Sequence, residues 1–120
     1  MFIRFVVGGD GDHHRSLTGI ITEARIRRDN GDLDEHQSAR LEDAYAWLNE
    51  HVPVPSFKHL PSDAVGWFRD EATQCIQRMW EIAHLLKECG VPVRLLRSAN
   101  PGKVVYEDDY QILVEEWHSL

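Results

Sequence analysis

The chain has 120 residues, carries 13 Lys and Arg against 20 Asp and Glu, and has a formal charge of −7 with 42% apolar residues. This length leaves room for one hydrophobic core, so we expect a single domain over residues 1–120 that folds without disulfides or metal. The ordinary apolar content excludes collagen-like and disordered classes, and no apolar run approaches the roughly 18 residues that a membrane span requires. The acidic balance argues against generic nucleic-acid binding, because Lys and Arg supply most of that affinity.

The cysteines and the first residues predict a cytoplasmic protein. Cys75 and Cys89 fall in one predicted helix, where their separation is about 21 Å, whereas disulfide-bridged Cα atoms lie within about 7 Å. They cannot pair with each other, and reduced thiols fit the cytoplasm. The apolar run at the start is too short for a secretory signal and is interrupted by Arg4, so we expect no targeting segment.

Residues 2–8 predict a strand that is covered on both faces. The run is rich in β-branched and aromatic residues, and both alternating faces are apolar; Arg4 alone interrupts the pattern. The strand ends at Gly8-Gly9, where a loop rich in Gly, Asp and His begins and continues to Ser16.

Two helices are predicted next, joined as a helical hairpin. The first runs from about Leu17 to Asp29, with Ser16 or Asp12 as its N-cap, and Asn30-Gly31 ends it. The second follows the D-x-x-E capping pattern of Asp32 to Glu35 and continues to about His51. Prolines at 53 and 55 then prevent a helix, so the stretch to Pro61 is a connector.

A third, long helix is predicted over residues 62–89. It is capped by Ser62 or Asp63 and ended by Gly90 in the left-handed C′ position. Its apolar residues repeat at steps of three and four and cover more than half of its circumference, whereas a helix on one surface needs a stripe of only about 100°. We therefore expect this helix to be covered on more than one side.

The period changes to two from Val91 onward, which predicts three strands arranged as a meander. Asn100-Pro101-Gly102 is a turn signal, a strand over 103–107 follows, and the acidic corner Asp108-Asp109 leads into the last strand. The expected fold is α+β with the order β-α-α-α-β-β-β: a four-stranded mixed sheet packed by the helical hairpin and the long helix.

The loop from Gly8 to Ser16 is the first candidate site, and three interpretations remain open. In the first, a divalent cation such as Mn, Fe or Zn is held by imidazole and carboxylate groups, as in a metal-dependent phosphoester hydrolase. Its ligands would be Asp10, Asp12, His13 and His14, with Glu107 or Asp109 as further candidates.

The second interpretation is an anion site at the start of the first helix. Gly9 and Gly11 would let backbone amides approach the anion and Arg15 would complete the charge, although the neighbouring aspartates oppose it. In the third, the glycines, aspartates and Ser16 only form turns and caps, and no chemistry follows. Two interpretations of the acidic corner also remain open: it is either an acid/base pair or a charged turn that keeps water at a sheet edge.

An association surface is the remaining candidate, and it is the function that we expect. Trp47 projects away from the apolar stripe of its helix, near His36 and Arg40, and aromatic residues with Arg form interface hot spots. Trp67, Trp80 and Trp117 add to an apolar surface larger than a monomer needs. We therefore expect a regulatory or accessory module that binds a protein partner or its own copy, rather than an enzyme with a cofactor; an acidic inhibitor that mimics nucleic acid is a third class.

The two ends of the chain resemble a known group of sequences. The opening segment over residues 5–15, FVVGGDGDHHR, and the closing segment over residues 100–111, NPGKVVYEDDYQ, are similar to a group of short bacterial hypothetical proteins with no assigned activity. The resemblance implies a bacterial source and no catalytic residue, cofactor or substrate.

Overall fold

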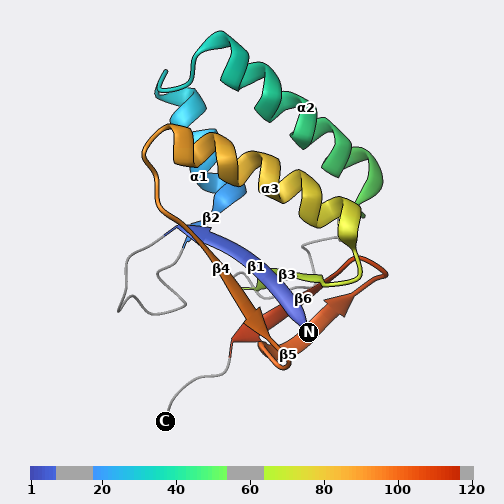
Figure 1. Ribbon diagram of the computed structural model, residues 1–120. Helices are drawn as coiled ribbons and strands as arrows, with labels where there is room; N and C mark the ends of the chain where they lie inside the picture. The colour runs from blue at the N-terminus through green and yellow to red at the C-terminus, as the bar shows by residue number, and fades with distance from the viewer. Residues whose placement is uncertain (8–17, 54–63, 117–120) are drawn as a thin grey trace.

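The computed structural model describes residues 1–7, 18–53 and 64–116. It confirms an α+β fold with three helices, and the helices lie together on one side of the sheet (Figure 1). In chain order the elements are β1 (Phe2–Val7), β2 (Thr18–Gly19), α1 (Ile20–Asp29), α2 (Glu35–His51), β3 (Val65–Arg69), α3 (Thr73–Glu88), β4 (Val93–Ser98), β5 (Gly102–Glu107) and β6 (Gln111–Glu116). No helix within this part of the chain is long and apolar enough to cross a bilayer.

The sheet is antiparallel throughout the described strands, so the predicted four-stranded mixed sheet is wrong. β4 pairs with β1 over its whole length, and on the other edge of β1 lie β3 at its start and β2 at its end. β3 then pairs with β6, and β6 with β5. Because β2 and β3 share one edge of β1, the six strands form a sheet five strands wide.

The predicted meander of the last three strands is also incorrect. β5 and β6 do form a hairpin, but β4 pairs with β1 instead of β5. The two outermost strands, β4 and β5, are joined by residues 99–101 alone, so the sheet has to curve until its edges approach each other. The curved face away from the helices buries a second apolar cluster, Trp67, Ile112 and Val114, with Phe2, Val65 and Leu96 packed against it.

The ladder between β1 and β3 opens after two residue pairs. Phe2 pairs with Arg69 and Ile3 with Phe68, after which β3 follows β6. β2 pairs with β1 only at Val6 and Val7. Within the described residues this edge of β1 therefore has no ladder partner at positions 4 and 5, in the middle of the strand.

The long helix over 62–89 is a second incorrect prediction. Residues Val65–Arg69 form strand β3, and the helix begins only at Thr73, after a turn in which the Ala72 amide donates to the Arg69 carbonyl. A run with Val, Trp and Phe around a glycine suits a pleated strand better than a helix. The helix ends as predicted, since Gly90 has φ +80° beyond its last turn.

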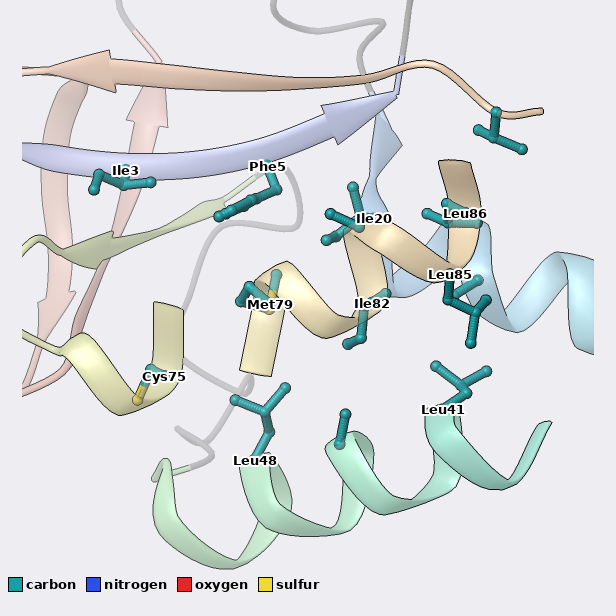
Figure 2. Close-up of a cluster of buried hydrophobic side chains, with 14 of the residues drawn as sticks. Ile3, Phe5, Ile20, Leu41, Leu48, Cys75, Met79, Ile82, Leu85 and Leu86 are labelled. Atoms are coloured by element: carbon teal, nitrogen blue, oxygen red, sulfur yellow. The ribbon is translucent and has the colours of Figure 1, made fainter. Parts of the chain in front are cut away.

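The apolar circumference of α3 is covered by the chain itself. Figure 2 shows Ile3 and Phe5 of β1 pointing toward α3 from one side and Leu41 and Leu48 of α2 from the other. α1 packs against α3 as well. Each buried Leu or Ile contributes about 1.5–3 kcal/mol, so this three-sided packing is the main core of the domain. The helix is indeed covered on several sides, but by its own chain.

The starts of α1 and α2 differ from the predicted ones by two to three residues. α2 has a capping box, but it joins Asp34 to Gln37 instead of Asp32 to Glu35. α1 starts at Ile20 with Gly19 as its N-cap, and the predicted caps Ser16 and Asp12 lie outside the described residues. The predicted stop at Asn30-Gly31 is confirmed, with Gly31 at φ +79°.

Candidate functional site

The predicted loop site lies outside the described residues. This applies to its metal ligands Asp10, Asp12, His13 and His14 and to its anion-binding residues Gly9, Gly11 and Arg15. In the ranges 1–7, 18–53 and 64–116 no group of three or more His, Cys, Asp or Glu side chains is placed to hold a metal ion.

Asp108 of the acidic corner is built into the turn between β5 and β6. One carboxylate oxygen accepts hydrogen bonds from the amides of Tyr110 and Gln111, at 2.8 and 3.0 Å, and the other accepts from the Tyr106 hydroxyl at 2.8 Å. Burial opposes ionisation of Asp108, but these hydrogen bonds outweigh it and lower the pKa of the carboxyl. The same contact raises the pKa of Tyr106, since its proton is held by Asp108.

The other two acidic residues of the corner do not converge with Asp108. The Arg69 guanidinium donates to Glu107 at 3.0 Å and to the Asp108 carbonyl at 2.9 Å, which ties β3 to the turn. Asp109 is exposed. The corner therefore has the contacts of a turn that fixes the β5–β6 hairpin. These contacts occupy the carboxylate of Asp108, which an acid/base pair would need.

The residues expected at an association surface are dispersed. Trp67 is only 2% exposed and belongs to the core of the sheet, so it is not available to a partner. Trp47 stacks on His51 with ring centroids 4.3 Å apart, and Trp80 packs edge-on against Phe5 and remains 37% exposed.

The remaining predicted surface residues do not extend a patch around these tryptophans. Arg40 pairs with Glu88 at 2.9 Å, which joins α2 to the end of α3, and His36 is exposed. Trp117 lies outside the described residues. The large apolar side chains that are exposed come from separate parts of the fold: Met1, Ile26, Trp80, Val104 and Tyr110. Isolated exposed apolar residues are usual on a protein surface.

A cavity of about 250 Å³ lies where β3 leaves β1. Its apolar wall comes from β1, β3 and the two helices nearest to them: Phe5, Ile20, Ile21, Trp67, Phe68 and Met79. Phe5, Ile20 and Met79 approach one another at this end of the main core (Figure 2). Its polar side chains are Arg4, Thr22 and Gln111, and the glycines 19 and 66 also line it.

Arg4 carries the charge of this cavity and crosses the opening in the sheet. Its guanidinium donates to the Gly66 carbonyl of β3 at 3.1 Å. It also lies against Gly19, because a Cβ atom built on that glycine would be 3.5 Å from Nη2. Among the described residues of the lining, Arg4 is the one with an ionisable side chain.

The start of α1 forms a second polar part of the wall. Ile20, Ile21 and Thr22, the first turn of this ten-residue helix, all line the cavity. The N-cap is Gly19, which has no side chain to accept hydrogen bonds from the first amides. A helix start without a side-chain cap presents its first amide donors and the positive end of the helix dipole.

Trp67 contributes a buried donor that lacks an acceptor. Its indole Nε1 has no hydrogen-bond partner, and it is the one such buried side-chain atom within the described ranges. An unpaired buried N–H is unfavourable by roughly 1–3 kcal/mol.

Sequence reasoning missed this site, although one signal for it was present. Arg4 is the charge that interrupts an otherwise apolar strand, and a charge in a strand predicted to be covered on both faces needs a partner or a role. Its neighbours Gly19 and Gly66 are 15 and 62 residues away, and only the topology of the sheet brings them together.

Comparison with family models, with curated proteins and with solved structures gave no match. The similarity to short bacterial proteins stays a prediction.

Proposed function

We propose that this protein binds a small molecule in the cavity between β1, β3 and the start of α1. The observation that carries the proposal is the composition of the cavity: apolar side chains from β1, β3, α1 and α3 together with the polar side chains of Arg4, Thr22 and Gln111. This is the usual composition of a ligand site. Its volume of about 250 Å³ is slightly below the roughly 300–1,000 Å³ of typical ligand pockets, so the ligand is small.

Binding is a better match to this wall than turnover. The described lining contains no His, Cys, Asp or Glu, which are the groups that most often transfer protons or attack a substrate. A metal-dependent hydrolase at the loop of residues 8–16 stays a prediction on residues outside the described part of the chain, and a nucleic-acid mimic rests on the net charge alone.

Association through α3, the function expected from the sequence, loses its main premise. That expectation depended on a helix over 62–89 with more apolar surface than its own chain could cover. The observed helix is shorter, and its buried residues are packed against β1, α1 and α2. We therefore place ligand binding ahead of association.

An NMR titration with a panel of small amphiphilic compounds, both charged and neutral, tests the proposal. We expect amide shifts that concentrate on Phe5, Ile20 and Phe68 and saturate with concentration. A matched pair of variants locates the site: Gly19→Leu fills the cavity, whereas Gly19→Ala adds one methyl group at ordinary contact distance on a backbone with φ −66°.

The expected result is binding to the Gly19→Ala variant and loss of binding to Gly19→Leu, with the circular dichroism spectrum unchanged in both. If no compound in the panel shifts these amides, or if the shifts persist unchanged in a folded Gly19→Leu variant, the cavity is not a ligand site.

A further inference from the structure

We propose that the ligand is an uncharged aromatic molecule of about two fused rings, which the cavity recognises by apolar contact and by size instead of by an ion pair. This inference rests on the proposed function and adds the charge, the chemical class and the size of the ligand. It is carried by the engagement of the polar side chains, by the aromatic rings of the wall and by the cavity volume.

The polar side chains of the wall are held by the protein or exposed. Arg4 donates to a main-chain carbonyl of β3 at 3.1 Å and takes part in a further interaction as well. The Gln111 side-chain amide donates to the Pro53 carbonyl at 2.9 Å and to the Asp108 carboxylate at 3.3 Å. These two bonds use both of its hydrogens. Thr22 is exposed. The wall therefore has its polar contacts without a ligand.

This engagement favours an uncharged ligand. A charged group that enters an apolar cavity loses its hydration, and the loss is unfavourable unless the wall supplies a partner for the charge. Arg4 is the one ionisable side chain among the described lining residues, and an anion would have to compete with the partners that Arg4 already has. A neutral apolar molecule avoids this cost, and its transfer from water to the cavity is favourable in proportion to the apolar area that it buries.

Aromatic rings in the wall favour an aromatic ligand over an aliphatic one of the same size. Phe5, Trp67 and Phe68 all line the cavity, and Met79 lies beside Phe5 (Figure 2). The Phe5 ring is held edge-on by Trp80, with centroids 4.9 Å apart and an angle of 89° between the rings, so its orientation is fixed before a ligand enters. Contacts between rings contribute beyond the area that they bury, and a thioether adds favourable contacts to a ring.

The volume of the cavity indicates two rings. An apolar cavity of about 150 Å³ holds one benzene molecule. This cavity is larger, at about 250 Å³, but smaller than the pockets that take drug-sized molecules. A single ring would leave part of the apolar wall without contact and would lose the corresponding dispersion attraction. A fused pair of rings fills the difference, so we expect a two-ring compound to bind more tightly than its one-ring counterpart.

The test compares four probes by NMR titration at pH 7 and one ionic strength. 2-Naphthamide is the uncharged two-ring compound, and 2-naphthoate has the same shape with a negative charge. Benzamide has one ring, and decahydro-2-naphthamide has two aliphatic rings. We expect 2-naphthamide to bind about tenfold more tightly than 2-naphthoate because of the cost of burying a charge, and about tenfold more tightly than benzamide because of the larger apolar area. Its advantage over the aliphatic amide should be about threefold.

A pair of variants on α1 tests whether the cavity sets the size of the ligand. Ile21 lines the cavity, so Ile21→Trp reduces its volume and should weaken 2-naphthamide binding about tenfold, with benzamide affinity changed by less than about threefold. Ile26→Trp makes the same substitution on the same helix, at a residue that is 45% exposed, and should leave both affinities unchanged. If circular dichroism shows that Ile21→Trp does not fold, Ile21→Phe applies the same test with a smaller loss of volume.

The outcomes separate this inference from the proposed function. If 2-naphthoate binds as tightly as 2-naphthamide or more tightly, the ligand is not selected for lack of charge, although ligand binding in the cavity stands. Equal affinity for benzamide, or a folded Ile21→Trp variant that still prefers 2-naphthamide, would overturn the two-ring size, and equal affinity for the aliphatic amide would overturn the aromatic class. If 2-naphthamide does not bind while another small compound shifts the amides of the cavity, this inference alone is rejected; if no compound shifts them, both proposals are rejected.

Discussion

The Arg4 guanidinium donates a hydrogen bond to the carbonyl of Gly66, 62 residues away, across the opening between β1 and β3. In a continuous ladder the main chain of β1 would supply such a bond. Here the side chain bridges the strands, and the space that the separated strands leave becomes the cavity. Arg4, the charged residue of this otherwise apolar strand, therefore connects β1 and β3 at the point where their backbone ladder has ended.

Arg4→Met should destabilise the domain, because the variant keeps the apolar stem of the side chain and removes its donors. We expect a loss of about 1–2 kcal/mol in the free energy of unfolding, measured by urea denaturation. Arg97→Met is the control, since Arg97 is exposed on β4 and should change stability by less than about 0.5 kcal/mol. Equal effects of the two substitutions would mean that the bridge to Gly66 contributes nothing.

The part of the site that depends on local sequence could be predicted, and the part that depends on topology could not. Arg4 was recognisable as an exception within an apolar strand, because a two-residue period makes such an exception visible. Gly19 and Gly66 carry no comparable signal. They become part of a site only because β2 and β3 pair with the same edge of β1, a relationship that no local pattern encodes.

β3 shows why the fold prediction failed where it did. Phe68, Ala72 and Cys75 are spaced three and four apart, so the strand and the turn after it continue the helical spacing of α3 by coincidence. A five-residue strand is too short for its alternation to outweigh that spacing. α2, by contrast, combines an N-terminal capping signal with a long periodic segment, and it lies within three residues of its predicted start.

Asp108 should make the stability of the domain depend on pH in the acidic range. Its folded-state pKa is lowered, so its carboxylate stabilises the fold above the unfolded-state pKa of about 3.9, and this contribution is lost as the pH falls through the folded-state value. Asp108→Asn should therefore cost about 1 kcal/mol at pH 7 and progressively less below pH 4, measured by urea denaturation at each pH.

Asp109→Asn is the matched control for this experiment, because it changes the neighbouring exposed carboxylate in the same turn. A difference between Asp108→Asn and the unmodified chain that stays constant from pH 7 to pH 3 would contradict the assignment of the effect to the ionised carboxylate.

The capping box of α2 should contribute measurably to stability. The Asp34 carboxylate accepts from the Gln37 amide at 2.7 Å, and the Gln37 side chain accepts from the Asp34 amide at 3.0 Å. Asp34→Ala removes the first bond and should lower the free energy of unfolding by about 1 kcal/mol, which corresponds to a decrease of about 4 °C in Tm. Asp34→Asn keeps an acceptor, so its Tm should remain within about 1–2 °C of the unmodified chain. Equal losses in the two variants would argue against the cap.

The two cysteines should report the packing of α3 through their reactivity. Cys75 is 1% exposed in the main core, and burial, together with the charge of Asp108, raises the pKa of its thiol. Cys89 follows the last residue of α3 and is partly exposed. Because the thiolate is the reactive form and must also be accessible, DTNB should label Cys89 at least about a hundredfold faster than Cys75, which reacts only when the core opens. A Cys89→Ser variant isolates the slow reaction, and its rate should rise in step with urea-induced unfolding. Rapid labelling of Cys75 in the folded variant would mean that α3 is not enclosed by β1, α1 and α2, and it would reopen an exposed α3 face as a surface for association.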